Sequence, residues 1–184
     1  MKHGFDLNLR KGVVVVGLLL LISITSVGYV QAAGLTPDET KWLTYMREEE
    51  KLARDVYISL YGMYGSRIFN NISKSEQRHM DAIKTLLDRY GIEDPAGTKG
   101  PGAFTDPDLQ KLYNDLINKG DDSLIDALEV GMIIEETDID DLITAIASTN
   151  RKDIKRVYSN LLQGSYNHLD AFCSNLARFG VTCE

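Results

Sequence analysis

Cysteine and positive charge are both scarce in this sequence. Its 184 residues include two cysteines, no Cys-x-x-Cys spacing, and 20 basic against 27 acidic side chains, for a net charge of −7. Rubredoxin-like and zinc-ribbon modules hold their metal with Cys-x-x-Cys motifs, so both are excluded. Nucleic acid is excluded as a partner, because the acidic residues are spread along the chain and no basic patch remains to contact phosphates.

One long apolar run, residues 12–30, follows a short basic segment and ends at Val30-Gln31-Ala32-Ala33. This order is typical of an export signal, so we expect residues 1–32 to be a signal peptide that is cleaved after Ala32. The run is somewhat long for a signal peptide, and the alternative is a membrane anchor retained over residues 12–30. Either way, residues 33–184 form one domain outside the cytoplasm, secreted or held at the membrane by that segment alone.

The two cysteines, Cys173 and Cys183, lie close together near the C-terminus. Export brings them into oxidising conditions, which favour a disulfide that ties the tail to the last helix. The alternative is that Cys173 is a small buried apolar side chain without a partner.

The apolar periodicity predicts four long helices and no strands. They are expected at about residues 37–61, 66–90, 122–148 and 152–179. The stretch from Gly91 to Pro107 is rich in glycine and proline, and a short helix is expected after it, over residues 108–119. Such a connection is long enough to cross from one end of a bundle to the other. The predicted fold is therefore all-α: a four-helix bundle with a crossover that contains a short extra helix between helices two and three.

The second long helix has two polar residues in its apolar seam. The seam residues step by three and four along one face, and they are Phe69, Ile72, Glu76, His79, Ile83, Leu86 and Tyr90. Burying Glu76 beside His79 is costly unless something pairs with both, and a Glu-x-x-His pair one turn apart can bind one metal ion. The alternative is a buried Glu–His hydrogen bond that only holds the core together.

The other three long helices carry polar residues at the same level. Their seams contain Glu50, Glu135 and His168, each near the middle of its helix. At about 1.5 Å of rise per residue, these positions fall within roughly two turns of one level of a bundle. Glu49 lies at the edge of the first seam, and Glu50 is the better inward candidate because it steps in line with core residues.

Both histidines beyond the leader lie at this level, which favours a metal site over a purely structural network. The predicted ligands are Glu50, Glu76, His79, Glu135 and His168. Carboxylates with imidazoles and no thiolate favour iron or manganese, with zinc as a further option. Two ions bridged by carboxylate are the usual outcome of this number of ligands.

The motifs resemble those of the ferritin-like superfamily, most closely its rubrerythrin side and a branch catalogued as a domain of unknown function. The resemblance covers about residues 36–180. It rests on the first-helix segment Glu50-Lys51-Leu52-Ala53-Arg54-Asp55-Val56-Tyr57, on Ser75-Glu76-Gln77-Arg78-His79, on Gly131-Met132-Ile133-Ile134-Glu135, and on His168. It implies a ferritin-like bundle with two iron ions. Glu135 and one other carboxylate would bridge the ions, and His79 and His168 would each bind one of them.

The sequence departs from that family pattern at two positions. Ser165 stands where the fourth helix should have the Glu of Glu-x-x-His, and Met132 replaces the extra third-helix Glu of rubrerythrins. One metal position is therefore short of a ligand. Asp138 or Glu136 could supply the missing oxygen, or either could be an exposed acid on a solvated face.

The resemblance implies an exported di-iron oxidoreductase, of peroxidase or ferroxidase type, that reacts with dioxygen or peroxide. Because the chain has no rubredoxin module, its electrons would come from a separate redox donor protein or from ferrous iron itself. One alternative is non-catalytic iron binding or sequestration, to which the acidic surface would draw cations. Another is a metal-free helical interaction module. Assembly into a homo-oligomer is left open by the sequence.

Overall fold

The computed structural model describes residues 34–183, and in this range the chain forms five α-helices, one 3-10 helix and no strand. The elements are α1 (Pro37–Tyr64), α2 (Arg67–Tyr90), α3 (Pro107–Gly120), α4 (Leu124–Ser148), α5 (Lys152–Leu176) and η1 (Ala177–Phe179). The prediction of an all-helical fold is confirmed. The leader predicted for residues 1–32 lies outside the described residues. None of the helices within residues 34–183 is both long and apolar enough to span a membrane.

Local sequence signals set the ends of α1. At its start, the Thr36 hydroxyl accepts from the Glu39 backbone N–H at 3.1 Å, and the Glu39 carboxylate accepts from the Thr36 N–H at 2.8 Å. The helix ends three residues later than predicted because Gly62 stays helical. The left-handed residue that stops the helix is Gly65, with a φ of 62°.

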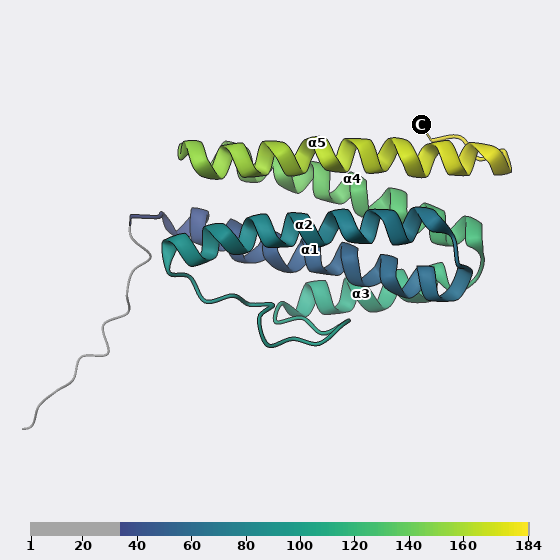
Figure 1. Ribbon diagram of the computed structural model, residues 1–184, viewed down its shortest axis with the longest axis horizontal. Helices are drawn as coiled ribbons and strands as arrows, with labels where there is room; N and C mark the ends of the chain where they lie inside the picture. The colour runs from purple at the N-terminus through teal and green to yellow at the C-terminus, as the bar shows by residue number, and fades with distance from the viewer. Residues whose placement is uncertain (1–33, 184) are drawn as a thin grey trace, which may run out of the picture.

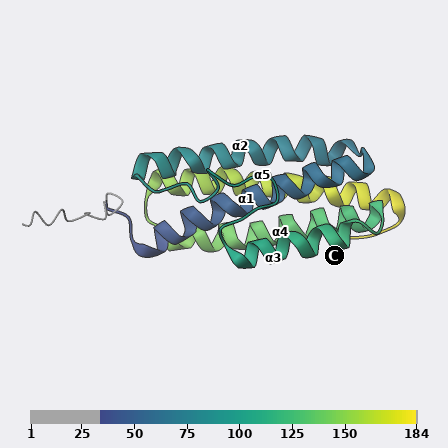
Figure 2. The same ribbon diagram turned by 90° about the horizontal axis from the view of Figure 1, so that it is seen from below.

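Figures 1 and 2 show the four long helices lying lengthwise beside one another. α1 packs mainly against α2, and α4 against α5, while α1 also contacts α4 and α2 contacts α5. The connection after α2 leads along the bundle to α3, which packs against α1 and α4, so that α2 and α4 run in the same direction (Figure 1).

Two apolar cores lie on either side of a polar layer. One core contains Tyr57, Phe69 and Phe172, whose ring centroids are 5.3 to 6.3 Å apart. The other core contains Met46 and Ile83 together with residues of α4 and α5. Each long helix therefore contributes apolar residues to both cores and polar residues to the layer between them.

The crossover is fastened to α1 by buried charge. The Lys51 ammonium donates to the Asp55 carboxylate at 2.6 Å and to the carbonyls of Gly100 and Ala103 at 2.9 and 3.1 Å. It also lies 4.3 Å from the centre of the Phe104 ring. The side chains of Lys51 and Asp55 are each 1% exposed. The hydrogen bonds from Lys51 satisfy backbone carbonyls in a segment that forms few backbone hydrogen bonds of its own.

Replacing Lys51 should therefore loosen the crossover. We expect Lys51→Met to lower the free energy of unfolding by roughly 2–4 kcal/mol, because the Gly100 and Ala103 carbonyls each lose a hydrogen bond and the buried Asp55 carboxylate loses one of its two basic partners. The matched control is Lys84→Met, which breaks an exposed pair with Asp88 and should cost less than about 1 kcal/mol. Urea denaturation of both variants is the measurement, and equal losses would show that the crossover is not held by this contact.

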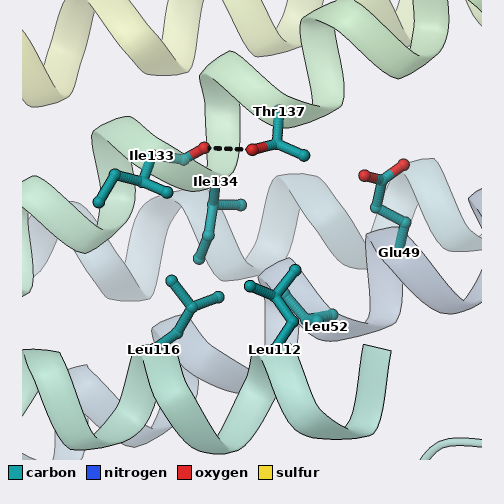
Figure 3. Close-up of a pocket in the computed structure, with 7 residues that line it drawn as sticks. All are labelled: Glu49, Leu52, Leu112, Leu116, Ile133, Ile134 and Thr137. Carbon is teal, nitrogen blue, oxygen red and sulfur yellow. Dashed lines mark hydrogen bonds between the residues drawn. The ribbon is translucent and has the colours of Figure 1, made fainter. Parts of the chain in front are cut away.

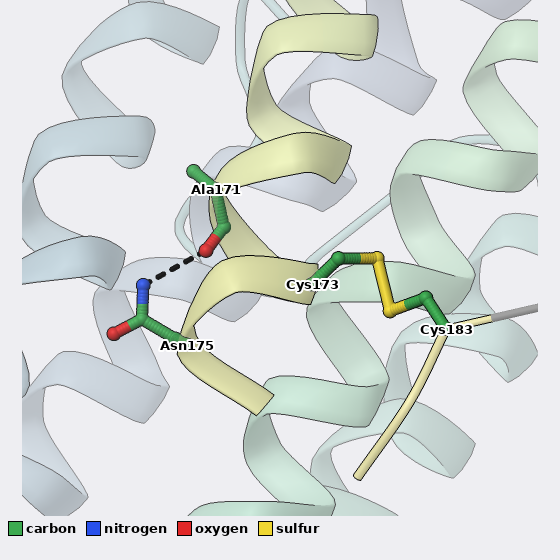
Figure 4. Close-up of a disulfide and its surroundings, with 4 residues drawn as sticks. All are labelled: Ala171, Cys173, Asn175 and Cys183. Atoms are coloured by element: carbon green, nitrogen blue, oxygen red, sulfur yellow. Dashed lines mark hydrogen bonds between the residues drawn. A yellow bond between two sulfur atoms is a disulfide. The ribbon is translucent and has the colours of Figure 1, made fainter. Parts of the chain in front are cut away.

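Cys173 and Cys183 form a disulfide between α5 and the C-terminal tail, with a Cα–Cα distance of 5.7 Å (Figure 4). The tail first turns at Gly180, which has a φ of 78°, and the Val181 N–H donates to the Leu176 carbonyl at 3.2 Å. The bridge therefore closes a short local loop between the end of α5 and the tail.

Reduction of this disulfide should free the tail without unfolding the bundle. A loop this short stabilises the fold by about 2–3 kcal/mol, so faster amide exchange is expected in residues 173–183 and little change elsewhere. Hydrogen exchange with and without reductant measures this. Two reactive thiols in the untreated native protein, or cooperative loss of helicity on reduction, would contradict it.

Candidate metal centre

The five predicted ligands come together at one level of the bundle. α1 supplies Glu50, α2 supplies Glu76 and His79 one turn apart, α4 supplies Glu135, and α5 supplies His168. The three carboxylate residues are 1 to 2% exposed. Helical periodicity places each of them on the side of its helix that faces the others.

These residues form two sets of three side chains that could hold a metal ion, called the ligand sets below. In the first set, His79 Nδ1 lies 3.1 Å from Glu50 Oε2 and 2.7 Å from Glu76 Oε2. In the second, His168 Nδ1 lies 2.8 Å from Glu76 Oε1 and 3.4 Å from Glu135 Oε2. The ligand atoms of each set lie within 4.8 Å of one another. Glu76 belongs to both sets and offers a different oxygen to each.

The family resemblance implies that Glu135 bridges two ions, whereas in the structure Glu76 is the carboxylate that belongs to both sets. Glu135 belongs only to the set of His168, because the buried hydroxyl of Tyr57 donates to its Oε1 at 2.7 Å and leaves Oε2 to face the imidazole. Tyr57 was not among the predicted site residues. Its position two turns beyond Glu50 on the same face was the signal that it could reach this layer.

Charge in the layer is balanced mainly by the two imidazoles. Burial lowers the pKa of each, but the neighbouring carboxylates outweigh it and raise the pKa of His79 to about 11 and that of His168 to about 10. Burial raises the pKa of Glu50 and of Glu135, each to about 7. Burial also acts to raise the pKa of Glu76, but the imidazoles on either side outweigh it and lower this pKa to about 2.

Three buried atoms of the two ligand sets lack a hydrogen-bond partner: Glu50 Oε1, Glu76 Oε1 and His168 Nδ1. Although Glu76 Oε1 and His168 Nδ1 are 2.8 Å apart, the contact does not have the alignment of a hydrogen bond. Buried polar atoms are nearly always satisfied, and unsatisfied oxygen and nitrogen atoms that converge are able to coordinate a cation.

The rings of His79 and His168 stack with their centroids 5.6 Å apart, and both side chains are 11% exposed. They form the edge of the centre between α2 and α5. The His79 ring fits here because residue 164 of α5 is glycine: a Cβ atom at Gly164 would lie 2.6 Å from His79 Nε2. The sequence signal for this was a glycine within an otherwise helical pattern.

The other candidate residues, Glu49, Glu136 and Asp138, lie outside both sets. Glu49 and Asp138 are buried, and Asp138 accepts a hydrogen bond from Ser165. Glu136 is exposed, because the residue after Glu135 is turned by about 100° around the helix and faces solvent. Met132 is half-buried and packs against the apolar core that contains Tyr57.

Comparison with known proteins gives a family but no activity. Residues 39–184 match a family model described as an uncharacterized protein domain, DUF2202. The chain is 49% identical over 146 residues to the uncharacterized protein MJ0754 of Methanocaldococcus jannaschii, which covers 79% of each chain. It is also similar to the crystal structure of hypothetical protein MJ0754, with a TM-score of 0.80 at 48% identity, over 82% of this chain and 86% of that one.

A second solved structure shares the fold alone. It is a DUF305 fragment from Deinococcus radiodurans, with a TM-score of 0.57 at 14% identity, over 78% of this chain and 97% of that one. Because the DUF2202 model spans most of the sequence and the relative from Methanocaldococcus jannaschii is nearly half identical, the protein belongs to the DUF2202 family of uncharacterized domains.

Proposed function

We propose that this protein is an exported, ferritin-like protein that binds two iron ions and uses them in redox chemistry with dioxygen or peroxide. The observation that carries the proposal is the pair of ligand sets that share Glu76. A carboxylate with one oxygen directed to each of two neighbouring sites is suited to bridge two ions.

The order of the helices supports the ferritin-like assignment. α1 and α2 form one antiparallel pair, α4 and α5 form another, and a single long connection with α3 joins them (Figure 1). Di-metal bundles of this class take a Glu from each of two helices and a Glu-x-x-His pair from each of the other two. Glu50 and Glu135 correspond to the single acids, Glu76 and His79 to one pair, and His168 to the histidine of the second pair.

The residues present fit a pair of hard or borderline cations. Oxygen and imidazole donors without thiolate favour iron or manganese and also accept zinc. Glu50 and His79 would hold one ion, Glu135 and His168 the other, and Glu76 would contact both. Bound iron would supply the electrons that reduce dioxygen or peroxide.

The surrounding residues would control the centre. The apolar cores on both sides of the layer exclude bulk water, which strengthens electrostatic contacts within it. Tyr57 fixes the orientation of Glu135 through its hydrogen bond, as outer partners of metal ligands commonly do. With no Cys-x-x-Cys motif in the chain, a separate donor protein or ferrous iron would provide electrons.

Reversible iron binding without turnover is the second candidate function, and Ser165 favours it. This residue leaves the second ion one carboxylate short, and a weakly held ion is easier to release. A peroxide-consumption assay separates the two functions, since a catalyst removes many equivalents of peroxide and a binding protein reacts at most once per bound ion.

The metal content of purified variants tests the centre directly. Protein expressed in metal-rich medium should carry about two iron or manganese ions per chain by elemental analysis. Glu76→Gln should lose both ions because both sets include that carboxylate, and Glu135→Gln should lose one. Glu136→Gln is the matched control, since its exposed side chain lies beside Glu135 and outside both sets, and it should keep both ions. Parent protein without iron or manganese would falsify the proposal.

Ser165 should make the two ions unequal in affinity. The His168 ion lacks the fourth carboxylate, so we expect its dissociation constant to be higher by at least roughly 10- to 100-fold. Ser165→Glu should narrow this gap, whereas Ser165→Gln, which is equally large but uncharged, should not. Calorimetric metal titration of the three proteins is the measurement. Equal, tight binding of two ions in the parent, unchanged by Ser165→Glu, would mean that another residue already completes the site.

A further inference from the structure

The imidazole of His79 lies between two carboxylates and the backbone of α5. On one edge, its Nδ1 lies 2.7 Å from Glu76 Oε2 and 3.1 Å from Glu50 Oε2. The other edge faces Gly164, where an added Cβ atom would lie 2.6 Å from Nε2 and 2.7 Å from Cε1. Real Cβ atoms essentially never come within 3.0 Å of such an atom, so His79 takes this orientation only because position 164 carries no side chain.

The orientation of this ring is set by packing on its Nε2 side. All hydrogen bonds and ion pairs that His79 forms with residues 34–183 use Nδ1. A metal-binding histidine almost always donates its other ring N–H to a carboxylate, a backbone carbonyl or water, and that contact fixes the orientation of the ring. For His79, the protein contacts that limit rotation are the Gly164 backbone and the stacked ring of His168.

The second imidazole does not depend on Gly164 in this way. The same added Cβ atom would lie 4.0 Å from His168 Cε1, which is an ordinary van der Waals distance. His168 follows Gly164 by one turn of α5, so a small side chain at position 164 would lie beside that ring without displacing it. Gly164 therefore limits the position of only one of the two imidazoles.

The His79 ring lies nearer to the surface than the carboxylates that it contacts. Its side chain is 11% exposed, against 1% for Glu50 and 3% for Glu76. Between α1, α3 and α4, by contrast, Glu49 borders a cavity of about 20 Å³ that is lined mainly by leucine and isoleucine and has room for about one water molecule (Figure 3). A displaced His79 ring would therefore move outward at the edge between α2 and α5, away from Glu50 and Glu76.

We propose that Gly164 is a positioning residue for one half of the centre, because it allows the His79 imidazole to lie against Glu50 and Glu76, where these three side chains take one of the two ions. This inference rests on the proposed function, since it requires the ligand sets to bind cations. Gly164 itself does not contact an ion. A side chain at this position would turn His79 outward and remove the nitrogen ligand from that ion alone.

Titration calorimetry of the full chain with Mn²⁺ tests this role in two backgrounds that each keep one imidazole. In His168→Gln the remaining complete set is that of His79, and Gly164→Ala should weaken its binding at least about 10-fold. In His79→Gln the remaining complete set is that of His168, and Gly164→Ala should leave its affinity unchanged. Equal binding with and without Gly164→Ala in the His168→Gln background would overturn the proposal.

Two other helical glycines provide matched controls. An added Cβ atom at Gly62 meets no atom within 4 Å, whereas at Gly120 it would lie 2.7 Å from Leu60 Cδ2. Gly62→Ala therefore reports the effect of the substitution on a helix, and Gly120→Ala reports a similarly close clash outside both ligand sets. Both should bind Mn²⁺ as the parent does. Equal weakening by Gly120→Ala and Gly164→Ala would assign the effect to lost stability and overturn the proposal.

Nuclear magnetic resonance of the metal-free protein gives a readout that needs no ion. The sequence contains three histidines, His3, His79 and His168, so their ring signals can be assigned by single substitutions. Gly164→Ala should move the ring signals of His79 more than those of His168, because the contacts of His79 Nδ1 with the two carboxylates are lost. Unchanged His79 signals would overturn the proposal.

The outcomes for the centre and for Gly164 can be separated. A parent that binds neither Mn²⁺ nor ferrous iron would contradict the proposed function, and the metal-free spectra would then decide whether Gly164 positions His79. If Gly164→Ala does not fold, the double variant with His79→Ala removes the ring that the new methyl group would meet. A double variant that folds would support the proposal. A double variant that does not fold, while His79→Ala alone folds, would overturn it.

Discussion

The structure depends on one costly constraint, the burial of charged side chains halfway along four helices. Moving a carboxylate or an imidazolium out of water costs several kcal/mol per ion unless partners compensate. The two apolar cores on either side make the fold stable enough to tolerate this layer, and the Glu76 contacts to His79 and His168 compensate part of its charge. Residues that orient the layer, such as Tyr57, come from the cores themselves.

The burial of charged side chains also explains why the crossover packs against α1. Residues 48–51 of α1 are four consecutive charged side chains, and all four are buried. Four consecutive residues cover every side of a helix, so α1 is enclosed all round at this level. Glu50 faces His79. Glu48 accepts from the backbone of the crossover at Thr105 and Asp106, and Lys51, one turn further along the helix, donates to carbonyls of the same segment. The crossover is therefore part of what holds Glu50 in place.

Much of the fold was predictable because each signal is local. Caps, glycines and apolar periodicity located the helices, and the seam of α2 identified Glu76 and His79. The burial of Glu48 and Lys51 could not be predicted, since it depends on the loop at residues 100–106, which has no periodicity. Glu136 was kept as a candidate because sequence spacing alone does not define the width of a buried face, and the space that Gly164 leaves for His79 is visible only between helices.

Metal binding and folding should be coupled by this charge pattern. The level of the layer holds five buried carboxyl groups, at positions 49, 50, 76, 135 and 138, and two imidazoles, so acidic groups outnumber basic ones. A cation that binds only the folded state adds its binding free energy to stability, by about 2.7 kcal/mol at 100 times its dissociation constant. A metal-free interaction module would not need such a layer, because replacing buried ionic groups by apolar residues often leaves the folding stability unchanged or raises it. On the proposed function, the unpartnered acids between the two apolar cores would serve cation binding rather than packing.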